Sequence, residues 1–158
     1  MSDAESRFRG LWFEEFTPGL MIQTRGRTIT ETDLVNFAGV SGDYNPMHTN
    51  ADYAQTTDFK ARVAHGALIF SVATGLAYQL GILEGTVIAF REFGMKLSLP
   101  VFIGDTIHVD LTVKESKPMA RLGGGLVVLD VRVINQRDDV VQRGDWAILM
   151  KAAPKTPK

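Results

Sequence analysis

The clearest pattern in the chain is the alternation of apolar and polar residues in its second half. Between residues 107 and 114 every second residue is isoleucine, valine or leucine, and the residues between them are polar or charged. Such alternation predicts strands that bury one face, and strands that follow one another without helices predict an antiparallel sheet. Gly104-Asp105 and Asp138-Asp139 supply turn residues between them. The strands expected from this pattern are 95–99, 107–114, 126–134 and 141–151.

A different pattern occupies residues 66–80, which contain no charged residue and read as a helix that ends at Gly81. A helix that is apolar nearly all round belongs inside a protein. In so small a chain the sheet must wrap around it. We therefore predict an α+β architecture, a curved antiparallel sheet around a central buried helix.

Two further segments before residue 66 carry sequence signals for the start of a helix. Thr30 and Asp33 have the spacing of a capping box, and apolar residues at helical spacing follow until Gly39 and Gly42. Asn50 is placed to cap a further short helical turn.

Length and composition narrow the class of protein. The chain has 158 residues, which suits a single domain, with flexible residues at 1–12, the domain at 13–151 and a loose tail at 152–158. A net charge of -1 gives no sign of the basic surface that binds nucleic acid. The chain contains no cysteine, signal peptide or apolar stretch long enough to cross a membrane, so we expect a soluble, cytoplasmic protein.

The candidate chemistry lies in the segment Asp-Tyr-Asn-Pro-Met-His, which runs from Asp43 to His48. Pro46 fixes its own φ and keeps Asn45 out of helical geometry, so the loop is stiff. A stiff loop can hold a carboxylate and an imidazole in one geometry. Addition of water to a double bond needs such a pair, because one group takes a proton while another delivers one.

Two other interpretations of these residues stay open. In the first, Asp43 caps a turn and His48 is an ordinary surface histidine, since loops rich in Asp and Asn are common turns. Asp43, His48 and His65 also have ligand chemistry, but no tight spacing of the His-Glu-x-x-His kind is present, and we expect no metal.

The segment from Asp43 to His48 resembles the Asp-x-Asn-Pro-x-His signature of MaoC-like dehydratases, also called (R)-specific enoyl-CoA hydratases. The resemblance continues through Tyr53-Ala54, residues 62–66 and residues 99–105, and covers nearly the whole chain. Lys60-Ala61 departs from it, because a Gly-Arg type pair is often seen there. The resemblance implies a hot-dog fold.

The same resemblance implies roles for individual residues. Asp43 and His48 would activate water, and Asn45 would support the loop. The backbone N–H of Gly66, at the start of the central helix, would bind the thioester carbonyl, where a helix N-terminus offers unpaired donors. His65 would orient the loop, and a hydroxyl at Thr74 would touch the site.

The leading hypothesis is therefore reversible hydration of a trans-2-enoyl thioester, with coenzyme A as a more probable carrier than acyl carrier protein and no other cofactor. Lys60, Arg62, Arg91 or Lys96 are candidates to meet the carrier's phosphates. Two alternatives are a thioesterase, which the lack of Asp and Glu in residues 66–80 disfavours, and a non-catalytic acyl-thioester binding module. An open sheet edge in a single hot-dog domain predicts a homodimer or higher homo-oligomer.

Overall fold

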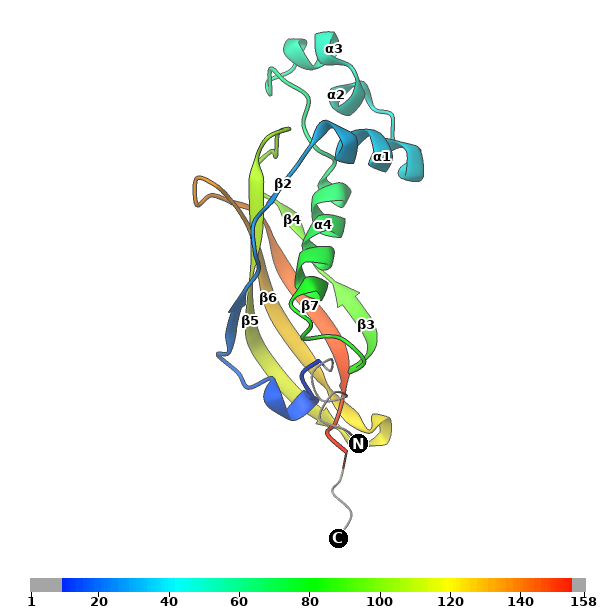
Figure 1. The fold of residues 1–158 in the computed structure, drawn as a ribbon, viewed down its shortest axis with the longest axis vertical. Coiled ribbons are helices and arrows are strands. Elements are labelled where there is room, and N and C mark those ends of the chain that lie inside the picture. The colour runs from blue at the N-terminus through cyan, green and yellow to red at the C-terminus, as the bar shows by residue number, and fades with distance from the viewer. Residues whose placement is uncertain (1–9, 155–158) are drawn as a thin grey trace.

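The computed structural model describes residues 10–154, and its main feature is one curved antiparallel sheet (Figure 1). The strands are β1 (Met21–Gln23), β2 (Arg27–Thr28), β3 (Val87–Phe93), β4 (Lys96–Leu97), β5 (Thr106–Met119), β6 (Gly124–Asn135) and β7 (Val140–Lys151). The sheet runs in the order β1-β5-β6-β7-β3, while β2 pairs with β5 and β4 pairs with β7. β3 and β4 together therefore form one edge of the sheet.

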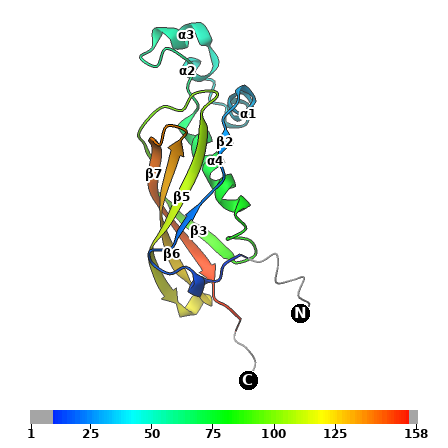
Figure 2. The same ribbon diagram turned by 60° about the vertical axis from the view of Figure 1, so that its left-hand side comes forward.

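The helices are α1 (Glu31–Ser41), α2 (Pro46–Thr49), α3 (Ala51–Thr56) and α4 (Gly66–Gln79), with 3-10 turns η2 (Phe13–Glu15) and η3 (Ala120–Leu122). α4 lies along the inner face of the sheet, as Figures 1 and 2 both show. α1, α2 and α3 gather beyond one end of the strands, at the N-terminal end of α4. We call residues 31–65, which contain these three helices, the overhang.

α4 packs on the sheet through one face only. Its buried side chains are Leu68, Ile69, Ala73, Leu76 and Ala77. They meet the inward residues of β5, β6 and β7, which alternate with exposed ones as the sequence pattern predicts. The opposite face of α4, which includes Ala67, Ser71 and Tyr78, is exposed. The curved sheet therefore wraps around the helix from one side. None of the helices in residues 10–154 is long and apolar enough to span a membrane.

The capping signals identified in the sequence are confirmed. The Thr30 hydroxyl accepts a hydrogen bond from the Asp33 N–H, and the Asp33 carboxylate accepts one from the Thr30 N–H at 2.8 Å. The side chain of Asn50 accepts from the N–H of Tyr53 at 3.0 Å and starts α3. Gly81 follows α4 with a φ of 73°, the left-handed conformation that favours glycine at this position.

The main difference from expectation concerns β3. The pattern of residues 95–99 predicts a strand there, but only β4 forms in that stretch, and the long edge strand is β3, residues 87–93. Its pairing with β7 shifts register twice, between Val87 and Ala89 and between Phe90 and Glu92. Each bulge breaks the period-two alternation, so β3 carries no regular pattern by which to recognise it.

The two ends of the chain were expected to be flexible at residues 1–12 and 152–158. Residues 1–9 and 155–158 lie outside the described part. The N–H groups of Gly10 and Leu11 donate to the carbonyls of Glu84 and Ile82, and the Ala152 N–H donates to the Gly123 carbonyl. Residues 10, 11 and 152 are therefore hydrogen-bonded to the domain, although the flexible ends were expected to include them.

Candidate active site

The Asp43–His48 segment is a tight turn between two helices. α1 ends at Gly42, whose φ of 75° turns the chain. The Asn45 side chain accepts a hydrogen bond from the Met47 N–H at 3.2 Å and caps α2, and Pro46 occupies the first turn of that helix. The Asp43 carboxylate accepts from the Asn45 N–H at 3.2 Å. Local hydrogen bonds thus fix the turn on both sides of Asn45, which matches its expected supporting place.

His48 is only 8% exposed and has a defined tautomer. Its Nδ1 lies 2.7 Å from the carbonyl oxygen of Val63. A carbonyl can only accept, so Nδ1 carries the hydrogen and donates it. The other ring nitrogen, Nε2, therefore has a lone pair that is available to take a proton.

His65, which is 2% exposed, joins the turn to the start of α4. Its Nε2 donates to the backbone carbonyl of Asp43 at 2.9 Å, across 22 residues of sequence. Its ring stacks on that of His48 with centroids 3.8 Å apart, and Phe37 contacts it with a centroid distance of 5.0 Å. These contacts place His65 where it can orient the loop.

Asp43, His48 and His65 each bring one polar side-chain atom to within 4.8 Å of those of the other two. The planes of the two imidazoles differ by only 29°. Lone pairs lie in the ring plane, so nearly parallel rings do not direct theirs at one shared point as a metal ion needs. The arrangement suits proton transfer between Asp43, His48 and a small molecule better than it suits a metal site.

A cavity of about 390 Å³ lies between the overhang and the edge of the sheet, and both His48 and Gly66 line it. Gly66 is the first residue of α4. Its N–H therefore has no acceptor within the helix and lies at the positive end of the helix dipole. The remaining lining residues are Met47, Phe59, Val63, Ala64, Ile69, Leu97, Ser98, Leu99, Pro100, Val101 and Gln142. An apolar cavity with an imidazole and a helix N-terminus can hold an acyl group and bind negative charge on a carbonyl oxygen.

Glycine at position 66 keeps the start of α4 open. A Cβ built there would lie 2.6 Å from Cδ1 of Leu97. Any side chain would therefore have to displace Leu97, which is two-thirds exposed, and would stand beside the N–H at the start of α4.

Thr74 does not join this group of residues. Its hydroxyl donates to the Ser71 carbonyl at 2.8 Å, within its own helix. Of the predicted site residues only His48 and Gly66 line the cavity, and Asp43, Asn45, His65 and Thr74 do not. The expected contact of Thr74 with the site remains a prediction.

Two parts of the chain to which the sequence analysis gave no role in the site also build it. Residues 97–101 form one wall of the cavity, and Gln142 of β7 reaches it from the sheet. Gln142 follows two valines in a predicted strand. A glutamine among apolar strand residues is the one signal in the sequence that could have indicated a buried polar role for it.

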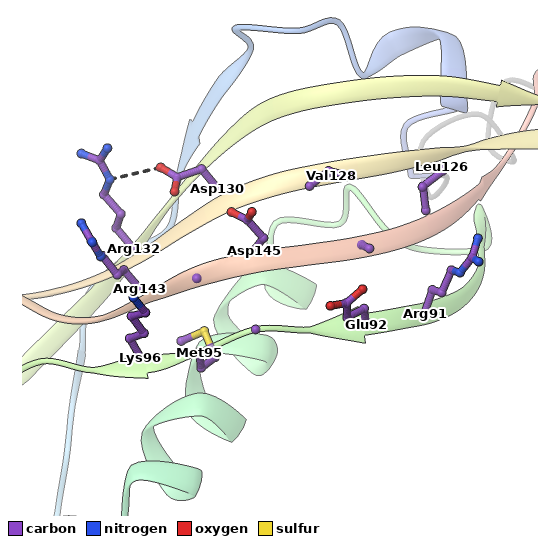
Figure 3. Close-up of a pocket in the computed structure, with 13 residues that line it drawn as sticks. Arg91, Glu92, Met95, Lys96, Leu126, Val128, Asp130, Arg132, Arg143 and Asp145 are labelled. Carbon is purple, nitrogen blue, oxygen red and sulfur yellow. Dashed lines mark hydrogen bonds and ion pairs between the residues drawn. The ribbon is translucent and has the colours of Figure 1, made fainter.

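A larger hollow, about 930 Å³, lies on the outer face of the sheet (Figure 3). Lys96, Arg143 and Arg132 stand at one end of it, and Arg132 donates to Asp130 at 3.2 Å. It contains neither histidine nor the start of α4, so we do not assign the chemistry to it.

The basic residues considered for the carrier's phosphates are dispersed. Arg91 and Lys96 line the outer hollow, whereas Arg62 donates two hydrogen bonds to Glu31, and these lower the pKa of that carboxylate. Lys60 lies near Arg62 at a separate surface depression.

Comparisons with known proteins agree with this geometry. A family model described as a MaoC like domain matches residues 15–134. The (R)-specific enoyl-CoA hydratase of Rhodospirillum rubrum is 42% identical over 103 residues, which cover 65% of this chain and 69% of that one. The crystal structure of a monoamine oxidase regulatory protein from Archaeoglobus is 34% identical, with a TM-score of 0.85, and the match covers 92% of this chain and 97% of that one.

The fold is also that of a more distant structure. A Mycobacterium tuberculosis protein described as a double hot-dog fold is 20% identical with a TM-score of 0.79, over 94% of this chain and 46% of that one. Together with the curved sheet around α4, this confirms the expected hot-dog fold. The family match spans most of the chain, and the chain therefore belongs to the MaoC-like domain family.

Proposed function

We propose that the chain is a hydro-lyase that reversibly hydrates a trans-2-enoyl thioester to the (R)-3-hydroxyacyl thioester. The observation that carries this proposal is that the Asp43 carboxylate lies within 4.8 Å of an imidazole nitrogen of His48, while His48 lines a cavity together with Gly66, the first residue of α4. The name of the Rhodospirillum rubrum relative supports the reaction and its stereochemistry.

In the proposed mechanism, Asp43 and Nε2 of His48 hold a water molecule. One of the two takes a proton from the water as its oxygen bonds to C3 of the substrate. The C2–C3 double bond becomes an enolate, whose oxygen accepts a hydrogen bond from the Gly66 N–H. The proton taken from the water then passes to C2, from the group that took it or by way of the other, so both groups return to their starting state and the net change is addition of one water. No metal or cofactor takes part, and coenzyme A enters only as the carrier of the acyl group.

The test is an assay with crotonyl-CoA that follows loss of the enoyl absorbance. Asp43→Asn and His48→Gln each remove a proton-transfer group and keep its size. We expect each to lower kcat by about a hundredfold or more, the usual effect of one general acid or base. The matched controls are His108→Gln and Asp58→Asn, which change the same residue types outside the group of Asp43, His48 and His65 and should leave kcat unchanged. Full turnover in both site variants would refute the proposed pair.

The two alternatives give different results in the same assay. A thioesterase releases free thiol, while a hydratase removes the enoyl chromophore without thiol release. A non-catalytic binding module retains ligand affinity and shows neither change. α4 contains neither Asp nor Glu, so it lacks a carboxylate that could attack the thioester.

We also propose that the carrier is coenzyme A in preference to acyl carrier protein, and that the chain works as a homodimer in the cytoplasm. The assembly has support in two neighbouring features. β3 is an edge strand with exposed Ile88, Phe90 and Phe93, and one face of α4 is uncovered. Unpaired strand edges with apolar side chains are surfaces that a second copy can cover.

A further inference from the structure

Gln142 is a buried amide side chain with one fixed orientation. It is 2% exposed, lines the cavity, and its Nε2 donates to the Gly66 carbonyl at 2.8 Å. A carbonyl oxygen only accepts hydrogen bonds, so the NH2 end of the amide must face Gly66. The other end, Oε1, must then point away from α4.

Oε1 of Gln142 has no hydrogen-bond partner within the described chain, although it is shielded from solvent. Buried polar atoms nearly always have a partner, because an unpaired one loses its hydration without compensation. Oε1 can only accept. Whatever satisfies it must therefore bring an N–H or O–H group into the cavity.

Gln142 faces inward in phase with Trp146 and Ile148, and a β-bulge lies beside it. Val133 pairs with Gln142 and Ile134 pairs with Val140, so Val141 is an extra residue in β7. Val141 and Gln142 are consequently both buried, although neighbours in a regular strand face opposite sides. The Val141 carbonyl accepts the N–H groups of Ser98 and Leu99, so the bulge also holds the wall of the cavity. Bulges are common next to active sites.

The position of Gln142 indicates which part of a ligand it meets. Gln142 is paired with Leu97 of the edge strand β4, and the Leu97 side chain is 67% exposed. Gln142 therefore lies just inside the rim of the cavity. The carrier of a thioester is much larger than 390 Å³ and must remain at the rim. Its first hydrogen-bond donor is the amide N–H two carbons from the sulfur.

We propose that Oε1 of Gln142 accepts a hydrogen bond from this amide N–H, which makes Gln142 a determinant of specificity for pantetheine thioesters. The inference rests on the proposed function, since it requires an acyl thioester in the cavity. The same side chain would connect the carrier to the carbonyl of Gly66, whose N–H is assigned to the acyl carbonyl.

The test uses two crotonyl thioesters that differ in one group. One is the thioester of N-acetylcysteamine, which carries the amide N–H, and the other is that of 2-mercaptoethyl acetate, in which an ester oxygen replaces it. For the wild-type chain we expect kcat/KM to favour the amide thioester by about three- to tenfold, the usual effect of one neutral hydrogen bond. In Gln142→Met, which keeps length and removes both polar atoms, this preference should disappear.

Loss of the hydrogen bond to Gly66 would lower kcat/KM for both thioesters by the same factor. The ratio of the two kcat/KM values therefore isolates the contact with the ligand. Thr86→Val is the matched control. The Thr86 hydroxyl is also buried and unpartnered in the described chain, but the residue does not line the cavity, so the preference should persist there.

Equal loss for both thioesters in Gln142→Met would overturn the inference and leave Gln142 a structural residue. A wild-type chain with no preference would overturn it as well, and that measurement needs no variant. Absence of hydration with either thioester and with crotonyl-CoA would instead refute the proposed function.

Discussion

Lys60 has a backbone φ of 59°, a left-handed conformation that residues other than glycine rarely adopt. Such a conformation costs about 1–2 kcal/mol for a residue with a Cβ. The position is also where the sequence departs from its family resemblance, at Lys60-Ala61. The conformation gives a physical reason for a glycine at this turn.

We expect Lys60→Gly to raise the free energy of unfolding by about 1 kcal/mol, as the relief of backbone strain exceeds the entropy lost by glycine. Chemical denaturation measures this. Lys60→Ala removes the charge and keeps the Cβ, so it should give no gain. An equal gain in both variants would show that charge, not conformation, is responsible.

Asp105 shows how a buried carboxylate can stabilise a turn. Burial by itself would raise the pKa of Asp105, but hydrogen bonds from the Phe102 N–H, the Gln136 amide and the Arg137 guanidinium outweigh it, and the pKa is lowered. A carboxyl whose pKa is lower in the folded state adds stability above the unfolded value of about 3.9. That stability is lost as the pH falls below this value towards the folded pKa.

Asp105→Asn should therefore reduce the free energy of unfolding at pH 7 by about 1–3 kcal/mol, the cost of disrupting a buried, charge-assisted hydrogen-bond group. The difference between wild type and variant should shrink as the pH is lowered below about 4. Urea denaturation at a series of pH values measures both effects. A difference that is constant with pH would contradict an ionised Asp105 as the cause.

At the scale of elements, the sequence predicts long regular stretches and misses a short strand with repeated bulges. α4, β6, most of β7 and the first half of β5 are recognisable because each keeps one period over many residues, although β5 and β7 each contain one register shift. β3 is not, because two bulges interrupt it.

The same limit applies to the site. The turn from Asp43 to His48 is local, so its residues are adjacent in the sequence and could be identified there. Gln142 faces inward by the same alternation as Trp146 and Ile148, but its hydrogen bond to Gly66 joins distant parts of the chain, and the wall at 97–101 lines one cavity with His48 only in the folded chain. Neither relationship is encoded in local spacing.

The contact between α4 and β4 gives a prediction for Gly66. Gly66→Ala should lower kcat/KM for crotonyl-CoA by at least about tenfold, because the methyl group stands beside the amide that we assign to the thioester carbonyl. Stability should change little, as Leu97 is exposed and able to move.

The double variant Gly66→Ala, Leu97→Ala separates two explanations. It removes the clash with Cδ1 of Leu97 but retains the methyl group at the amide. Activity should stay low if a close approach of the thioester requires glycine. Recovery to the level of Leu97→Ala alone would mean that Gly66 serves only packing.

At the scale of the whole molecule, the open edge of the sheet predicts the assembly. We expect light scattering to give the mass of two chains. Ile88→Lys, which introduces a charge on the edge strand β3, should shift the mass toward one chain, since charges at sheet edges oppose pairing.

Ile103→Lys is the control for this assembly, because Ile103 is similarly exposed, 36% against 40% for Ile88, and lies outside β3. It should leave the mass unchanged. A wild-type chain that scatters as a monomer at assay concentration would contradict the predicted dimer.

The hydrogen bond between His65 and the Asp43 carbonyl has a consequence for how the substrate range of such a protein can change. The proposed proton-transfer groups are held by the overhang and the start of α4, while the wall that we expect to meet the acyl chain consists of residues 97–101 at the sheet edge. Replacing Leu99 or Val101 by a smaller residue would thus enlarge the space for the acyl chain without touching the histidines. New substrates are accessible to this scaffold by small steps that leave its reaction intact.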